Sequence, residues 1–175
     1  SIVKRMPDCV LAVQNTPMGS ATQCVCGGAG WMETPRGVQD MPAEALAAAR
    51  QEQERDLTTL LRDPSRVKAQ ALPEPVEVDG FPADVVLIQN PLVEAWKVYV
   101  DRQSRLVVRM DYRTQSELTG QPVIAQELLS DYRTVGGIQM AHTTRILYEG
   151  EPFLTVTLTS VKVNSGVDPA IFKKP

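Results

Sequence analysis

The residues best suited to chemistry in this chain of 175 residues are three cysteines near the start. Cys9, Cys24 and Cys26 are an odd number of thiols, so at least one has no disulfide partner within the chain. If residues 9–13 and 22–26 form a hairpin, alternate residues face the same side, and the register lets Cys9 face either Cys24 or Cys26 but not both. The sequence therefore predicts a disulfide, Cys9–Cys24 or Cys9–Cys26, and we take Cys9 and Cys24 as the first candidate pair.

Other chemistry finds little support in the sequence. A Cys-x-Cys pair with one distant cysteine supplies three metal ligands, and the only histidine, His142, is far from them. No serine has the glycine-flanked nucleophile motif, and the glycine cluster at residues 27–30 is not followed by Lys-Ser or Lys-Thr as in a phosphate loop. We expect a non-catalytic chain without cofactor or metal, in which His142 is a hydrogen-bonded or surface strand residue.

Charge and composition exclude further classes of protein. The net charge is -3, the pI is near 5.2, and no basic cluster is interleaved with aromatics, so nucleic acid is not an expected partner. No apolar run reaches the roughly 20 residues of a membrane-spanning helix, so no transmembrane segment is predicted, and the first residues lack a signal-peptide pattern. The apolar content of 43% is enough for one core, which favours a single domain over residues 1–175.

Apolar residues two apart dominate the second half of the chain and are typical of half-buried strands. Short turn signals separate these runs, which favours antiparallel neighbours. The fold class predicted is α+β, mainly β, with a curved antiparallel sheet and one long helix across it. The strands are expected over residues 2–6, 9–15, 21–26, 31–34, 66–72, 76–79, 83–90, 94–101, 106–114, 123–132, 138–148 and 153–164, with a bulge near residues 159–160 in the last.

The helix is predicted over residues 43–62, where strong helix formers are concentrated. Asp40 is the expected cap and Pro64 ends the helix. This helix could be a lid or a plain cover of one sheet face. Farther along, Asp131 and Arg133 should share a strand face and pair, while Gly136-Gly137 supplies the positive φ angles of a two-residue hairpin turn.

An apolar wall is predicted on one side of the sheet. A later strand should add His142, Thr144, Ile146 and Tyr148 to a shared face. The wall either lines a cavity for a long apolar ligand or belongs to a filled core, and alternation alone leaves both open. The candidate ligand-binding residues are Trp96, Val98, Leu106, Val108, Met110 and Tyr112.

Several local patterns resemble the outer-membrane lipoprotein-sorting proteins with the LolA-like fold. They are Trp96-Lys97-Val98-Tyr99-Val100-Asp101, then Ser130-Asp131-Tyr132-Arg133 with Gly136-Gly137-Ile138, then Val161-Lys162-Val163-Asn164 with Val167-Asp168 and Ile171-Phe172. Gly30-Trp31 and the segment 37–61 are similar to a narrower group, the LolA-like domain at the C-terminal end of bacterial insulinase-type zinc peptidases. Methionine and alanine stand at 140–141, shortly after the turn glycines, where members often have a proline.

The resemblance implies an unclosed antiparallel barrel outside the cytoplasm, whose cavity in the carriers holds acyl chains. We therefore expect a periplasmic or otherwise extracytoplasmic, non-enzymatic partner of an acyl chain or lipoprotein. Two alternatives stay open: an accessory domain of an insulinase-type zinc peptidase, and a structural subunit that assembles as a homo-oligomer through an open sheet edge. The domain is expected to lack the usual N-terminal helix and first strands.

Overall fold

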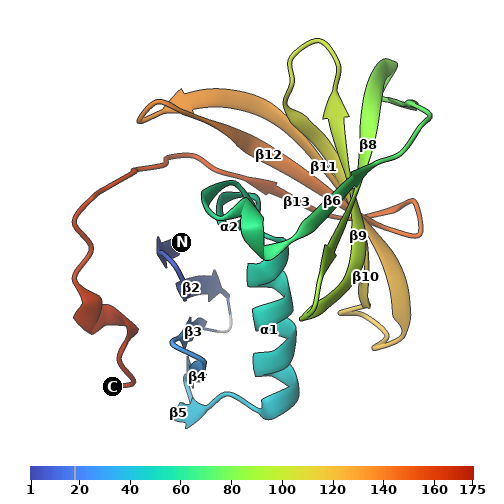
Figure 1. Ribbon diagram of the computed structural model, residues 1–175. Helices are drawn as coiled ribbons and strands as arrows, with labels where there is room; N and C mark the ends of the chain where they lie inside the picture. Colours follow the sequence, from blue (N-terminus) through green and yellow to red (C-terminus); the bar gives the residue numbers. More distant parts are fainter. Residues whose placement is uncertain (18) are drawn as a thin grey trace. The chain divides into compact units, whose positions relative to one another are not determined.

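A computed structural model describes residues 1–17 and 19–175, which form two compact units. The first unit contains Ser1–Pro64 and Asn164–Pro175, and the second contains Ser65–Val163. Each unit is built on its own antiparallel sheet (Figure 1). The predicted fold class, mainly β with an unclosed sheet and one long helix, is confirmed, although the strands are divided between two sheets. The assignment of all 175 residues to one LolA-like domain stays a prediction.

The sheet of the first unit is a meander in which each strand pairs with the next along the chain. Gly27 and Gly28 form the two-residue turn between Cys26 and Ala29, with φ of 59° and 86°. These positive angles explain the glycine cluster, because residues with a side chain rarely adopt them. The five strands are β1 (Ile2–Arg5), β2 (Cys9–Thr16), β3 (Gly19–Cys26), β4 (Ala29–Thr34) and β5 (Gly37–Asp40).

Both faces of this five-stranded sheet are covered within the first unit. One face carries a buried cluster of Cys9, Leu11, Cys24 and Trp31, and Phe172 from the short 3-10 helix η2 (Pro169–Phe172) completes it. The other face contacts helix α1 (Ala43–Arg55), where a Cβ built on Gly30 would lie 3.0 Å from Leu46 Cδ1. A side chain on Gly30 would therefore push the helix away from the sheet.

The predicted helix over residues 43–62 is divided in two at Asp56. Asp56 has extended backbone, and its carboxylate accepts hydrogen bonds from the backbone N–H groups of Thr58 and Thr59 at the start of α2 (Leu57–Arg62). An aspartate that can cap a new helix competes with continuation of the old one, which explains the break. The expected cap, Asp40, is instead the last residue of β5, and its Oδ1 lies 2.7 Å from Lys174 Nζ.

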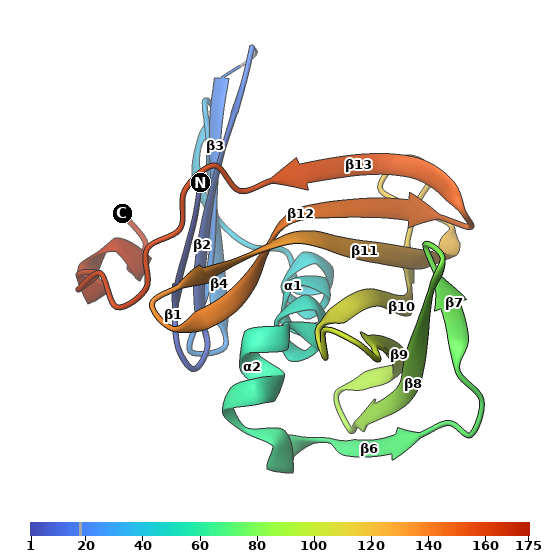
Figure 2. The same cartoon turned by 90° about the horizontal axis from the view of Figure 1, so that it is seen from above.

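The second unit contains an eight-stranded sheet with the order β13-β12-β11-β10-β9-β8-β6, while β7 also pairs with β8 (Figure 2). The short 3-10 helix η1 (Pro64–Arg66) precedes its first strand. The strands are β6 (Lys68–Ala71), β7 (Val76–Val78), β8 (Phe81–Asn90), β9 (Val93–Asp101), β10 (Val107–Gln115), β11 (Pro122–Val135), β12 (Ile138–Tyr148) and β13 (Glu151–Thr157).

The hairpin of β11 and β12 confirms two predictions made from the sequence. Gly136 and Gly137 form the two-residue turn between Val135 and Ile138, with φ of 59° and 83°. Arg133 Nη2 lies 2.6 Å from Asp131 Oδ2, so the two side chains pair as expected. The prediction of a bulge near residues 159–160 is wrong, because β13 already ends at Thr157. The register shift between β12 and β13 lies instead between Ile146 and Leu147.

Candidate functional site

A continuous row of cross-strand partners crosses six strands of the eight-stranded sheet. Residues directly opposite each other in antiparallel strands point to the same face, so the registers place these side chains side by side. We call this set the central row and the face that carries it the apolar face. The central row consists of Val86, Val98, Met110, Glu127, Ile146 and Leu154, in order from β8 to β13.

The apolar face changes from buried at β9 and β10 to exposed at β13. Val98 and Met110 are each 6% exposed, and Trp96 on the same face of β9 is 1% exposed. At the other end, Leu154 on the last strand of the sheet is 48% exposed, and Val156 on the same face of β13 is 36% exposed. An apolar strip that begins in the interior and ends at the surface is a suitable shape for a ligand that enters from one end.

Trp96 adds a polar feature to this face. Its indole Nε1 is buried and has no hydrogen-bond partner among the described residues. A buried N–H without an acceptor costs free energy, and the great majority of such groups in folded proteins do have one. The Trp96 N–H is therefore free to donate to an oxygen atom of a ligand or of a water molecule.

Glu127 is the only charged residue in the central row, and the sequence analysis missed it. The Tyr112 hydroxyl donates a hydrogen bond of 2.5 Å to Glu127 Oε1. A sequence signal was available, because Glu127 interrupts the apolar alternation of Ala125 and Leu129. The Tyr112 ring is thus held on the apolar face by a polar contact as well as by its register with Ala125.

Four of the six predicted ligand-binding residues share the apolar face, and two do not. Trp96, Val98, Met110 and Tyr112 share it, as the sequence indicated. The register between β9 and β10 shifts between Val107 and Arg109, and this bulge turns Val108 to the opposite face, where it packs against the buried cluster of Val78, Ala83, Val85 and Tyr99. Leu106 precedes β10, and its carbonyl accepts a hydrogen bond from the Asp101 N–H in the turn.

The opposite face of the same strands carries a polar cluster whose groups satisfy one another. Arg109 donates to both carboxylate oxygens of Asp111, at 2.6 and 2.8 Å, and lies with its Cζ 4.9 Å from the centre of the Tyr99 ring. The Tyr99 hydroxyl donates to Asp111 Oδ2 at 2.7 Å. Burial, followed by the hydrogen bond and the charge of Asp111, raises the pKa of Tyr99 to about 12. This geometry fixes side chains in place and resembles a structural ion pair.

His142 is a buried strand histidine, 4% exposed, with Nδ1 3.0 Å from the Met140 carbonyl oxygen. This contact confirms the expectation of a hydrogen-bonded histidine. Within residues 1–17 and 19–175, the structure has no cluster of three or more His, Cys, Asp or Glu side chains that could hold a metal ion.

The cysteine pairing differs from the first candidate pair. Cys9 forms a disulfide with Cys26, with the Cα atoms 4.0 Å apart, whereas Cys24 is a buried free thiol. The reason is the register, because Leu11 lies opposite Cys24 and so brings Cys9 opposite Cys26. The Cys24 thiol lies 3.4 Å from the Phe172 carbonyl oxygen, and burial raises its pKa.

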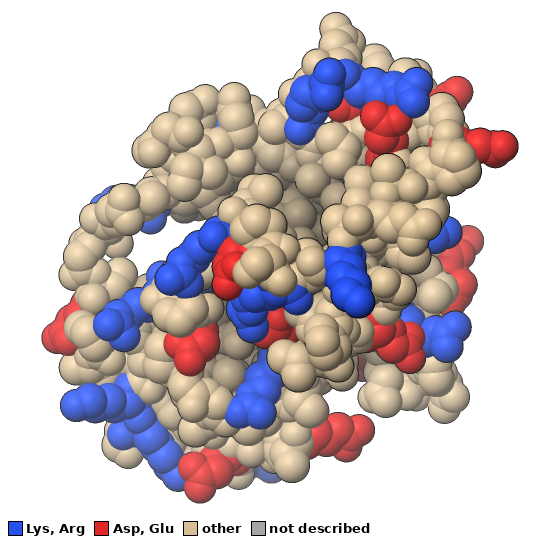
Figure 3. Space-filling view, in the orientation of Figure 1, with Lys and Arg blue, Asp and Glu red and all other residues tan. Residues whose placement is uncertain are grey.

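Lys and Arg are interspersed with Asp and Glu over the face of the molecule shown in Figure 3, where uncharged residues cover most of the surface. That face therefore presents no field of a single sign to attract a charged macromolecule. None of the helices formed by the described residues has the length and apolar character needed to cross a membrane. Comparisons of the chain with models of protein families, with curated proteins and with solved structures found no match.

Proposed function

We propose that this chain is a non-catalytic binding protein that holds an acyl chain or another long apolar ligand along the apolar face of its eight-stranded sheet. The observation that carries the proposal is the central row, which has apolar side chains at five of its six positions and runs from buried Met110 to exposed Leu154. The resemblance of residues 80–175 to the LolA-like lipoprotein-sorting proteins supports the same class of ligand.

The dimensions of the central row favour a long ligand. Neighbouring strands lie about 4.8 Å apart, so a row across six strands is roughly 24 Å long. Burying each methylene group of a ligand contributes about 0.8 kcal/mol, and a chain laid along the row gains this contribution many times over. The Trp96 N–H, which has no acceptor among the described residues, is suited to the carbonyl oxygen of an ester or acid at the end of such a chain.

An extracytoplasmic location is part of the proposal. Disulfides form and persist outside the cytoplasm, and the Cys9–Cys26 disulfide therefore supports it. A carrier of acyl chains or lipoproteins in such a compartment would act by binding and release, and it would need no catalytic group. This agrees with the polar cluster around Asp111, whose groups already bind one another.

The test uses a fluorescent fatty acid, 11-(dansylamino)undecanoic acid, titrated into the delipidated chain. Leu154→Glu places a charge at the exposed end of the apolar face, and we expect it to weaken binding by tenfold or more because the charge must lose water. Thr155→Glu is the matched control, since Thr155 is also exposed but points to the opposite face. Equal affinity of the two variants would reject the apolar face as the binding site.

A second candidate function is assembly through an open sheet edge. β13 ends the eight-stranded sheet and carries the exposed apolar side chains Leu154 and Val156, and an exposed apolar edge strand is a template for strand addition. Oligomers whose size rises with concentration, and which Leu154→Glu disrupts while the dansyl probe does not bind, would favour assembly over ligand binding.

A further inference from the structure

The first unit contains a separate cavity, between its five-stranded sheet and its helices, with a volume of about 190 Å³. Sites for drug-sized ligands have volumes of roughly 300–1,000 Å³, whereas an engineered cavity of about 150 Å³ holds benzene. The cavity of this chain is thus large enough for a small molecule and too small for a long acyl chain. Any ligand of this cavity belongs to a different size class from the ligand proposed for the apolar face.

Most of the cavity wall is apolar. Ile2, Val10, Ala12 and Val25 come from the strands, and Met41 and Ala49 come from the helical side. The four strand side chains lie on the sheet face opposite the buried Cys24 and Trp31, because strand neighbours alternate between faces. A wall of this composition favours the apolar body of a ligand over a bare cluster of water molecules.

One hydrogen-bond donor in the lining has no acceptor in the part of the chain that the structure describes. Gln53 of α1 lines the cavity, and its Nε2 atom is buried without a hydrogen-bond partner among the described residues. A buried amide that makes no hydrogen bond is unfavourable by about 1–3 kcal/mol. An oxygen atom of a ligand in the cavity would remove this cost, so Gln53 is suited to recognise a carbonyl group.

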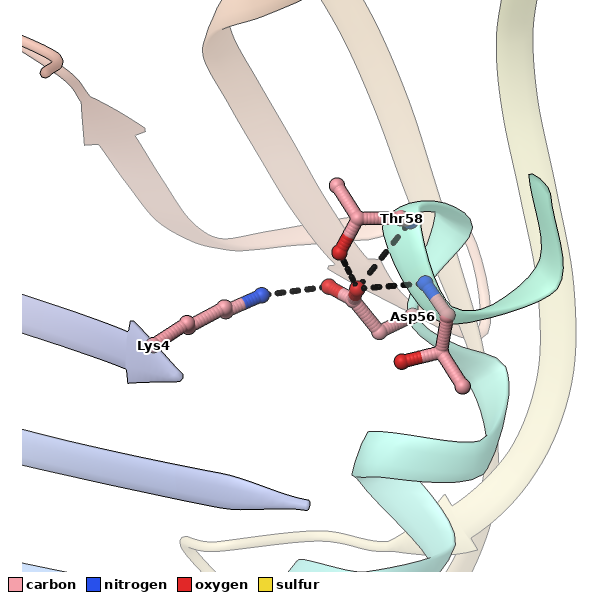
Figure 4. A network of polar contacts seen from close by, with 4 residues as sticks. Lys4, Asp56 and Thr58 are labelled. Carbon is pink, nitrogen blue, oxygen red and sulfur yellow. Dashed lines mark hydrogen bonds and ion pairs between the residues drawn. The ribbon is translucent and has the colours of Figure 1, made fainter. Parts of the chain in front are cut away.

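The charged groups in the lining argue against an anionic ligand. Lys4 of β1 reaches the carboxylate of Asp56, which also accepts hydrogen bonds from Thr58 and Thr59 (Figure 4). Burial by itself would raise the pKa of Asp56, but the charge and hydrogen bond of Lys4, together with the Thr58 and Thr59 donors, hold that pKa below its usual value. The positive charge of Lys4 is therefore already neutralised.

Glu52 adds a further carboxylate to the same lining, so the acidic side chains outnumber the lysine. A carboxylate ligand would meet this excess of negative charge without a free cation to pair with. A neutral ligand avoids the repulsion and still offers an oxygen to Gln53. The charge of the lining and the donor of Gln53 thus both favour a neutral ligand that carries an acceptor oxygen.

We propose that this cavity binds a small neutral molecule that has an apolar body and one carbonyl oxygen, such as a ketone or an ester. The apolar body contacts the strand residues Val10, Ala12 and Val25, and the carbonyl oxygen accepts a hydrogen bond from Gln53 Nε2. The ion pair of Lys4 and Asp56 forms the polar end of the wall and excludes anions. This site is independent of the function proposed for the apolar face.

The test uses 2-heptanone and heptanoate, which have the same number of carbon atoms but differ in charge. Each is titrated into the full ¹⁵N-labelled chain, and the side-chain amide signals of glutamine are followed by NMR. We expect saturable shifts with 2-heptanone at the Gln53 amide, identified by its loss in Gln53→Met, and at least tenfold weaker binding of heptanoate. Equal or tighter binding of heptanoate would overturn the proposal.

Variants locate the binding to the cavity. Gln53→Met keeps the length of the side chain but removes the donor, and we expect it to weaken 2-heptanone binding by roughly 2- to 12-fold, the net worth of one hydrogen bond. Gln51→Met is the matched control, because Gln51 lies on the same helix but is exposed and does not line the cavity. The proposal fails if the two variants bind 2-heptanone equally, or if the ketone shifts only residues outside the cavity.

Discussion

The disulfide between Cys9 and Cys26 should contribute a calculable part of the stability of the first unit. The two cysteines are 17 residues apart. The chain-entropy relation for a loop of that length gives about 3 kcal/mol at 25 °C, mainly because the cross-link restricts the unfolded chain. We therefore expect the double variant Cys9→Ala/Cys26→Ala to lose about 3 kcal/mol of unfolding free energy, and reduction of the unaltered chain to have a similar effect.

The measurement is urea unfolding followed by far-UV circular dichroism, with and without reducing agent. Cys24→Ala is the control, because it removes the buried free thiol and leaves the disulfide intact. Reduction should still destabilise Cys24→Ala but have no effect on the double variant. A Cys24→Ala protein that is insensitive to reduction, or whose denatured mass no longer shows the loss of two hydrogens, would refute the pairing and the register on which it rests.

Three further results are expected. Phe172→Ala should lower the unfolding free energy by about 3–5 kcal/mol in calorimetry or urea unfolding, because Phe172 is buried in the core of the first unit. Asp56→Asn should destabilise the chain at pH 7, and this loss of unfolding free energy should shrink in acid: the pKa of Asp56 is lowered on folding, so its contribution is present above the unfolded pKa and is lost as the pH falls through the folded pKa. In an ultraviolet titration, Tyr99 should ionise near pH 12, and Asp111→Asn should lower that pKa while burial keeps it above the usual value; an unchanged pKa in this variant would contradict the contact.

Most strand positions could be predicted from the sequence because the apolar residues alternate with period two, but β5 (Gly37–Asp40) was not expected and β13 ends earlier than predicted. The hairpin turn at Gly136-Gly137 and the pair of Asp131 and Arg133 were also predictable, because both depend only on residues close together in the chain. The partition into two sheets was not predictable, because it depends on which strands pair across the helical segment, and alternation contains no information about partners.

At two positions a single residue made the structure differ from the prediction, because two local preferences competed there. Asp56 lies in a segment of strong helix formers, yet its side chain caps a new helix and divides the predicted one. The bulge before Arg109 shifts the strand by one position, so Val108 faces away from Met110 although the two are separated by the strand period. The sheet face predicted for Trp96, Val98, Met110 and Tyr112 was correct. Met110 and Tyr112 lie beyond the bulge of β10, and β9 is regular where it pairs with them.

The two proposed binding sites differ in the chemistry that they select, and this makes them separable by experiment. The central row of the apolar face is roughly 24 Å long, which suits a long acyl chain, whereas the cavity of about 190 Å³ is too small for such a chain. Leu154→Glu acts on a strand of the eight-stranded sheet and Gln53→Met acts on α1 of the other unit. Because the sites share no residue, Leu154→Glu should weaken the dansyl fatty acid alone and Gln53→Met should weaken 2-heptanone alone. A variant that weakened both probes would show that the two sites are coupled, and the independence inferred from their residues would then be wrong.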